Sequence, residues 1–225
     1  MTHPVTPWSR LLVALLVALL APLCLAQAPA ADPGDELQEV AAEGMHAILA
    51  SPGIQRQGAR DADVTLIEYF DYNCPYCRRM VPTFAQLVAG DRKLVIVYKD
   101  WPILGEVSEY AARCALAASY QGKYLAAHDA LLDGPRLASH EVVDKLLVSA
   151  GIDPVRLGKD LAAHGAAIDG LLARHAAEAH ALLLDGTPGI IVDRQLMPGG
   201  AELGYIQNLV RLARSERAHA PQLKP

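Results

Sequence analysis

Two cysteines three positions apart are the residues of this 225-residue chain best suited to chemistry. Cys74 and Cys77 lie in the stretch YFDYNCPYCRRM, residues 69 to 80, where an apolar run gives way to a basic run that favours a helix. Three residues are close to one helical turn, so the two β-carbons should lie about 5 to 6 Å apart, within reach of a disulfide. Such a pair could be a structural crosslink, half of a metal site, or a redox pair.

The spacing of the pair weakens the first two interpretations. A crosslink that closes a four-residue loop gains only about 2 kcal/mol in the chain-entropy model, against about 3 kcal/mol for a fifteen-residue loop. A zinc site needs two further ligands, and the sequence has no second C-x-x-C and no two of its eight histidines three or four positions apart. Capture of Cu(I) stays open, because soft thiolates suit this ion and two of them can suffice.

A helix that begins at the first cysteine favours the redox interpretation. Unpaired backbone N–H groups and the helix dipole stabilise a negative charge on Cys74, and Pro75 fits the first turn because it has no N–H to leave unpaired. Arg78 and Arg79 follow one turn later, whereas Cys77 lies deeper and is shielded. We therefore predict Cys74 as the attacking sulfur, with a pKa well below that of a free thiol, and Cys77 as the resolving sulfur.

Further titratable residues surround the motif in sequence. Glu68 lies in a predicted buried strand, where an ionised carboxylate is costly unless paired, although it could instead reach the sheet edge and be solvated. Lys99 ends the next predicted strand and either neutralises Glu68 or is itself solvated. We expect Asp71 to lie in solvent and Tyr72 to contribute packing. Cys114 is expected to be buried as a small apolar residue, with intermolecular pairing as the alternative.

The elements that position these residues begin with a strand, a helix and a second strand. Residues 63 to 70 and 93 to 99 are apolar on both faces and rich in β-branched residues, which is typical of central strands. The helical stretch between them ends at Gly90. This spacing predicts a βαβ unit with a parallel strand pair and a right-handed crossover.

Helical character then dominates until the chain returns to the sheet. Residues 106 to 184 are rich in Ala and Leu, and we predict several short helices there with breaks at Gly122, residues 133 to 136, residues 151 to 154 and Gly165. Residues 189 to 197 predict a hairpin that turns near Asp193 and Arg194, and residues 201 to 216 predict a closing amphipathic helix. A short helix is also expected between residues 35 and 53, docked on its own domain or on another subunit.

The N-terminus has the outline of a secretory signal peptide. Arg10 precedes an apolar stretch that Pro22 interrupts, and small residues flank a cleavage position after Ala26. The stretch is shorter than the roughly 18 to 20 residues that a spanning helix needs. Lipid attachment at Cys24 is the competing interpretation. Cleavage would remove one arginine and no acid, leaving a net charge of −6, so nothing recommends a nucleic acid partner.

Three sequence stretches together resemble one known family. VTLIEYFDYNCPYC, then VYKDWPILG, then a helical stretch and finally GTPGIIV make the chain similar to the DsbA-like thiol-disulfide oxidoreductases of the thioredoxin superfamily, over about residues 54 to 215. The resemblance is closest to the bacterial branch that includes suppressors of copper sensitivity. It implies an α/β thioredoxin fold, a central mixed sheet flanked by helices, with a helical domain inserted in the chain.

The resemblance also implies roles for particular residues. Pro188 is in the position of the family's cis-proline and follows Thr187, whose backbone would bind an extended client segment as an added strand. Glu68 is in the position of an acid that exchanges a proton with the resolving thiol. Cys74 and Cys77 would form the redox disulfide.

The resemblance also implies which residues adjust the reactivity of the cysteine pair and which partners the protein has. Pro75 and Tyr76, between the two cysteines, would tune the motif. No organic cofactor and no metal is expected, and the partners would be unfolded or partly folded secreted proteins and a membrane redox protein that reoxidises or reduces the enzyme.

The resulting expectation is a periplasmic thiol-disulfide oxidoreductase. We assign residues 1–26 to the signal peptide, 27–53 to a lead-in with a short helix, 54–105 and 185–217 to the thioredoxin-like domain, 106–184 to the helical insertion and 218–225 to a flexible tail. The direction of exchange stays open, since oxidases, isomerases and reductases share this fold. A module that binds Cu(I) or unfolded chains without turnover is the alternative of another class.

Processing offers a direct test of the N-terminal assignment. Because small residues precede the predicted cleavage site, protein recovered from the periplasm should begin at Gln27, as its intact mass would show. A species that retains Cys24 with a diacylglycerol group would contradict both the cleavage site and the soluble location.

Overall fold

The computed structural model describes residues 38–219, and the predicted signal peptide lies outside them. Within these residues a mixed sheet has the strand order β1-β6-β5-β3-β4-β2. The strands are β1 (Gln38–Glu39), β2 (Gln55–Gly58), β3 (Val64–Phe70), β4 (Leu94–Asp100), β5 (Gly189–Val192) and β6 (Gln195–Pro198). The α/β thioredoxin fold predicted from the sequence is confirmed.

The centre of the sheet is the predicted parallel pair. β3 and β4 run parallel with Glu68 opposite Tyr98 and Phe70 opposite Asp100, and β5 pairs antiparallel with the other side of β3. Every residue of β4 is buried, as expected for a strand that is covered on both faces. Helix α3 (Pro75–Gly90) makes the crossover between the two strands.

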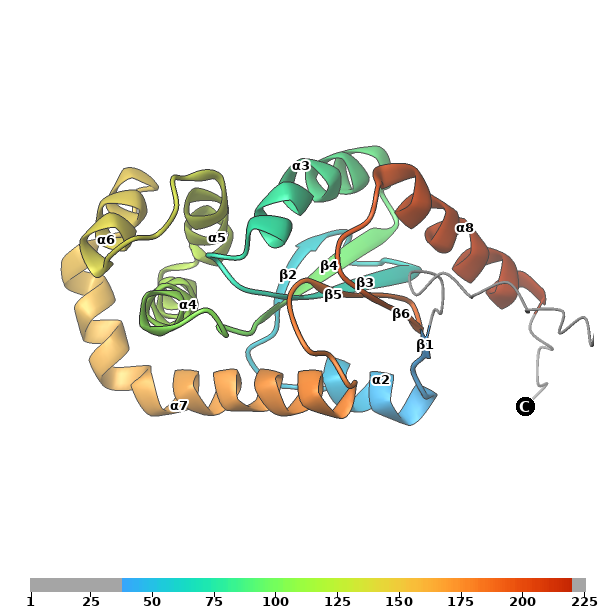
Figure 1. Ribbon diagram of the computed structural model, residues 1–225, viewed down its shortest axis with the longest axis horizontal. Coiled ribbons are helices and arrows are strands. Elements are labelled where there is room, and N and C mark those ends of the chain that lie inside the picture. The colour runs from blue at the N-terminus through green and yellow to red at the C-terminus, as the bar shows by residue number, and fades with distance from the viewer. Residues whose placement is uncertain (1–37, 220–225) are drawn as a thin grey trace, which may run out of the picture. The chain divides into compact units, whose positions relative to one another are not determined.

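Helices cover both faces of this sheet (Figure 1). Helices α3 and α8 (Leu203–His219) lie on one face, and α2 (Ala42–Leu49) with the C-terminal half of α7 (Pro154–Ala181) lies on the other. Two separate hydrophobic clusters result, one on each face of the strands. None of the helices in residues 38–219 is both long enough and apolar enough to cross a bilayer.

The inserted helical region follows β4, as predicted. It comprises α4 (Glu106–Ala118), a short 3-10 turn at Ser119–Gln121, α5 (Tyr124–Asp133), α6 (His140–Ser149) and α7. The prediction of a break at Gly165 is wrong, because this glycine lies inside α7, a continuous helix of 28 residues. A glycine within a helix costs only about 1 kcal/mol, and the burial of Ile168 and Leu172 just beyond it outweighs that cost.

The N-terminal part of the described chain differs from the expected single helix. Gln38 and Glu39 pair with β6 at the sheet edge, and the helix is limited to α2. Met45 and Ile48 of α2 are buried in the cluster on its face of the sheet, so the helix docks on its own domain. The predicted hairpin is confirmed as β5 and β6, with Asp193 at a positive φ of 57° in its turn.

Lys99 has neither of its two expected environments. Its side chain is fully buried, and Nζ lies 2.8 Å from Glu178 Oε2 of α7 while it donates to the Ile48 carbonyl at 2.9 Å. Side chains alternate along a strand, and Glu68 lies opposite Tyr98, so Lys99 is on the opposite face of the sheet from Glu68. Lys99 therefore joins α2 and α7 to the sheet and does not neutralise Glu68.

Removal of Glu178 tests the importance of this buried pair. The Ser51 and Tyr69 hydroxyls also donate to Glu178, so Glu178→Ala should leave several buried groups without partners and lower the free energy of unfolding by about 3 to 5 kcal/mol. The matched control is Asp61→Ala, which breaks the exposed ion pair with Lys93 and should leave the urea midpoint unchanged. Equal midpoints for the two variants would contradict the argument.

Candidate functional site

Cys74 and Cys77 lie at the start of α3, as the sequence predicts. Cys74 is the N-cap residue with an extended backbone, Pro75 occupies the first turn, and Cys77 lies one turn further in. Both side chains are buried and both thiols are free, so the structure describes the reduced pair. The Cys74 N–H donates to the Asp71 carbonyl at 3.0 Å, which closes the turn between β3 and the helix.

The pKa values of the two thiols are shifted in opposite directions, downward for Cys74 and upward for Cys77. A hydrogen bond from the Cys77 thiol, followed by contributions from Thr187 and from the backbone N–H groups of Cys77 and Tyr76, lowers the pKa of Cys74 to about 5 and outweighs the opposing effect of burial. Burial raises the pKa of Cys77, and the hydrogen bond to Cys74 and the charge of Glu68 raise it further. At neutral pH Cys74 is therefore a thiolate and Cys77 a thiol.

Thr187 and Pro188 lie beside the first sulfur. The peptide bond between them is cis, as the resemblance implies, and Cys74 Sγ, when it carries its proton, donates a hydrogen bond to the Thr187 carbonyl oxygen at 3.1 Å. The Pro188 carbonyl accepts from the Gly199 N–H at 2.7 Å, which ties this turn to the end of β6. Residues more than 110 positions apart in the chain thus meet at one sulfur.

Glu68 lies behind the pair in the middle of β3. It is 1% exposed, and neither carboxylate oxygen has a hydrogen-bond partner in residues 38–219. Burial raises its pKa well above the ordinary value, and the negative charges of Cys74 and Asp100 raise it further. The alternative that placed Glu68 at a solvated edge is wrong.

Asp71 was expected in solvent and is instead a buried centre of hydrogen bonds. Its Oδ1 accepts from the Asn73 N–H at 2.7 Å and from the Ser108 hydroxyl at 2.8 Å. Its Oδ2 accepts from the N–H groups of Ile103 at 2.8 Å and Leu104 at 2.9 Å. One carboxylate therefore fixes the loop after β4 against the turn that carries Cys74. Its position directly after a buried strand is the only signal in the sequence.

The arginine after the motif joins it to the helical region. Arg78 donates to the Tyr72 carbonyl at 2.8 Å, to the Leu131 carbonyl at 2.9 Å and to the Gly134 carbonyl. Leu131 and Gly134 belong to the end of α5, so the guanidinium connects that end to α3. Arg79 instead lies over the exposed Tyr76 ring, with its guanidinium carbon 4.3 Å from the ring centre.

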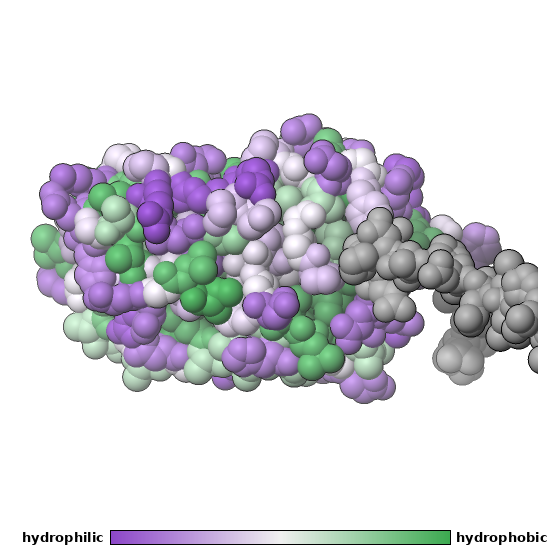
Figure 2. Space-filling view, in the orientation of Figure 1, coloured by the Kyte–Doolittle hydropathy of each residue, from purple (hydrophilic) through white to green (hydrophobic). Residues whose placement is uncertain are grey.

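Exposed apolar side chains accompany the motif. Tyr76, Ile103 and Leu104 are all more than a third exposed, and the last two belong to the loop that Asp71 holds. Figure 2 shows hydrophobic residues gathered at the surface over the region of α4, among hydrophilic ones. Cys114, in contrast, is fully buried in α4, and burial raises its pKa to about 12, as expected for a small apolar core residue.

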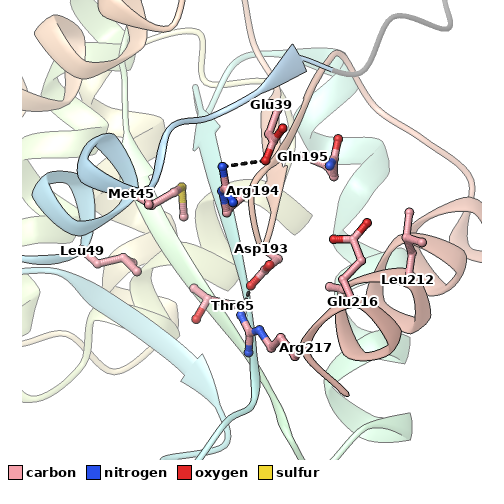
Figure 3. A pocket seen from close by; sticks show the side chains of 12 residues that line it. Glu39, Met45, Leu49, Thr65, Asp193, Arg194, Gln195, Leu212, Glu216 and Arg217 are labelled. Carbon is pink, nitrogen blue, oxygen red and sulfur yellow. Dashed lines mark ion pairs between the residues drawn. The ribbon is translucent and has the colours of Figure 1, made fainter. Parts of the chain in front are cut away.

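A cavity of about 450 Å³ lies away from the cysteines (Figure 3). Met45, Leu49 and Leu212 line it, and ion pairs join Glu39 to Arg194 and Asp193 to Arg217. Its residues belong to β1, α2, the start of β3, the β5–β6 turn with the first residue of β6, and α8. Cys74 follows the other end of β3, so this cavity is separate from the redox pair.

Comparisons with known proteins identify similar domains. The model of the DSBA-like thioredoxin domain matches residues 65–211. A thioredoxin-like oxidoreductase from Silicibacter pomeroyi DSS-3 shares 38% sequence identity over 78% of this chain and 99% of that chain, with a TM-score of 0.72. A periplasmic thioredoxin-like protein from Salmonella enterica serovar Typhimurium shares 25% over 79% and 99%, with a TM-score of 0.68. The catalytic domain of Proteus mirabilis ScsC, at 21% over 77% and 96% with a TM-score of 0.66, shares the fold.

Curated relatives match over a shorter stretch. The Na(+)/H(+) antiporter NhaA 3 of Salinispora tropica is 35% identical over 78 residues, which are 34% of this chain. The match covers only 12% of that relative's length. This similarity therefore concerns one segment of a much longer protein.

The contribution of Cys77 to the acidity of Cys74 can be measured by thiolate absorbance. In a Cys114→Ser background, Cys77→Ser keeps a hydroxyl donor, and the Cys74 midpoint should stay near pH 5. Cys77→Ala removes the largest stabilising contact, so the midpoint should move upward toward that of a free thiol, about 8.5. A midpoint at or above 8.5 in the serine variant would contradict the assignment of Cys74 as the activated sulfur.

Proposed function

Because this chain belongs to the family of DSBA-like thioredoxin domains, we propose that it catalyses thiol-disulfide exchange in secreted client proteins through Cys74 and Cys77. The observation that supports this proposal most strongly is the difference between the low pKa of Cys74 and the raised pKa of Cys77. A thiolate attacks and leaves readily, whereas a buried thiol is held back until a mixed disulfide has formed. A purely structural crosslink would need no such difference.

The proposed exchange begins from the disulfide form. A client thiolate attacks Cys74 Sγ, the Cys74–Cys77 bond breaks, and Cys77 leaves as a thiolate that takes up a proton. A second client thiolate then attacks the client sulfur of the mixed disulfide, and Cys74 leaves as its stabilised thiolate. The client gains a disulfide and the protein keeps the two electrons as a dithiol. Glu68, the buried carboxyl behind the pair, is the proposed proton donor to Cys77.

Client recognition is proposed for the turn beside Cys74. Thr187 offers backbone groups next to the sulfur, where an extended segment can pair as an added strand, with Pro188 shaping the turn. Tyr76, Ile103 and Leu104 would contact apolar side chains of the client. Such a surface would recognise the backbone and the apolar side chains of a client and would depend little on its sequence, which suits an enzyme with many unfolded clients.

The low pKa of Cys74 favours the oxidising direction. Whatever stabilises the thiolate stabilises the dithiol form of the protein over its disulfide, so the disulfide is the stronger oxidant. A membrane redox partner would then reoxidise the protein. Action as an isomerase or reductase of the same fold is the alternative, and in it the partner would keep the pair reduced.

The proposed location is the periplasm, reached through the signal peptide of residues 1–26. The apolar stretch and cleavage site of the sequence support export, as does similarity to a solved structure described as periplasmic. Oxidising compartments are also where a disulfide-forming enzyme has clients. No cofactor is required by the proposed exchange, because both electrons stay on sulfur.

Three cysteine variants test the proposed exchange with a dithiol peptide. Cys74→Ser should reduce the rate to that of the uncatalysed reaction, because the attacked sulfur is gone. Cys77→Ser, mixed instead with the disulfide form of the peptide, should accumulate a mixed disulfide on non-reducing gels, because the Cys74 thiolate opens the peptide disulfide and the resolving sulfur is missing. Cys114→Ser is the matched control and should keep the parent rate. Stoichiometric Cu(I) binding by the reduced protein, together with no exchange, would contradict the proposal in favour of a metal-binding module.

A further inference from the structure

A second buried acid lies near Glu68 and has no part in the exchange described so far. Asp100 ends β4 with a fully buried side chain, and its Oδ2 accepts a hydrogen bond from the Tyr124 hydroxyl at 2.9 Å. Its Oδ1 has no partner in the described residues, like both oxygens of Glu68. Two buried carboxyls near each other thus have three oxygens between them without a protein donor.

The strand register places the two acids on one face of the sheet. Glu68 lies opposite Tyr98 and Phe70 opposite Asp100, so Asp100 is two residues along the neighbouring strand. From the strand spacing and rise, their Cα atoms are roughly 8 Å apart. Leu66, Phe70 and Tyr98, which share this face, belong to the same hydrophobic cluster as Cys74 and Cys77. Both carboxyls therefore point to the side of the sheet that carries the redox pair.

We propose that Asp100 is a second acid of the redox site, joined to Glu68 through buried water, and that the two carboxyls share protons as one unit coupled to Cys77. This inference rests on the proposed function and assigns Asp100 as a positioning residue that acts through Glu68. Buried polar atoms without a protein donor are normally bound by buried water, which needs two or more polar partners. The two Glu68 oxygens and Asp100 Oδ1 can be the polar partners of such a water.

The groups around Asp100 support a shared proton. The Tyr124 hydroxyl of α5 and the Tyr72 hydroxyl, in the segment after β3, both favour the ionised form of Asp100, and His175 of α7 contacts the Asp100 carbonyl oxygen at 3.1 Å. The His128 ring packs against Tyr72 and Tyr124. Burial lowers the pKa of His128 and His175 to about 3, so both rings are neutral at pH 7.

No cation therefore comes from these neighbours of Asp100. Lys99, the preceding residue, lies on the other face of the sheet with Glu178. Burial raises the pKa of Asp100 to about 7, and burial and nearby negative charges raise that of Glu68. Two carboxyls in such a site ionise one after the other, so the pair holds one or two protons near neutral pH.

This proton content serves the exchange in both directions. When Cys77 leaves as a thiolate, a pair with a proton can give one to the sulfur. When Cys77 attacks a mixed disulfide, a pair with an ionised carboxyl can take the thiol proton. A lone buried carboxyl whose raised pKa keeps it protonated could give a proton but could not take one, so it would serve only the first of these steps.

Carboxyl titration of the reduced protein, followed by carbon-13 NMR of labelled Asp and Glu side chains, tests the inference without any client. The parent should show two coupled steps above the ordinary carboxyl range. Asp100→Asn should leave one step, with Glu68 titrating at least one pH unit below the upper step of the parent, because the like charge is gone. Glu68→Gln identifies which signal belongs to Glu68.

Asp160→Asn is the matched control, since Asp160 is another buried aspartate with one oxygen lacking a partner, in the helical region. It should leave the Glu68 titration unchanged. Identical Glu68 midpoints in the parent and Asp100→Asn would overturn the inference.

Tyr124→Phe is a second variant in case Asp100→Asn fails to fold. It removes the larger of the two side-chain hydrogen bonds that lower the pKa of Asp100, so the lower step should move to higher pH. An unmoved lower step would overturn the inference as well. Client exchange measured on the parent separates the two ideas: absent exchange refutes the proposed function, whereas present exchange with uncoupled carboxyls refutes the role of Asp100.

Discussion

The site stabilises a negative charge on Cys74 and disfavours one on the buried groups behind it, Cys77 and Glu68. The first turn of α3 directs N–H groups at Cys74, and the Cys77 thiol adds a donor, so a thiolate is stable there although the sulfur is buried. One turn deeper, Cys77 and Glu68 lie in a low-dielectric interior where burial disfavours their ionised forms. The difference in acidity between two sulfurs three residues apart follows from this gradient.

The rest of the fold maintains the gradient by keeping backbone polar groups paired around it. Asp71 holds the loop after β4 against the turn at Cys74, and Arg78 occupies the carbonyls at the end of α5. On the other face of the sheet, Lys99 and Glu178 neutralise each other beside α2. The fully buried charged side chains are thus distributed so that acids lie on the side of the sulfurs, and the buried lysine lies on the far side of the sheet.

The sequence predicts what depends on local pattern and misses what depends on pairing between distant segments. β3, β4 and the helix start at Cys74 follow from β-branched runs and from Pro75, and the family resemblance places Pro188 beside Cys74. β2, with the polar sequence QRQG, gives no such signal because it is held by backbone pairing with β4.

Asp71 and Lys99 were misplaced for the same reason. Three of the four donors to Asp71 come from residues more than 30 positions further along the chain, and Glu178, the partner of Lys99, comes from a helix almost 80 positions away. Asp100 became a candidate only when the register brought it to the face of Glu68.

The contacts of Arg78 bear on how such a domain can be modified or diversify. One side chain that immediately follows the C-P-Y-C motif also closes the end of α5, so the motif and the inserted helices are not independent modules. A chimera that exchanges the helical region would have to present carbonyl groups at the positions of Leu131 and Gly134, or replace the arginine at the same time. Change in either part is therefore constrained by the other, and the two are expected to diverge together.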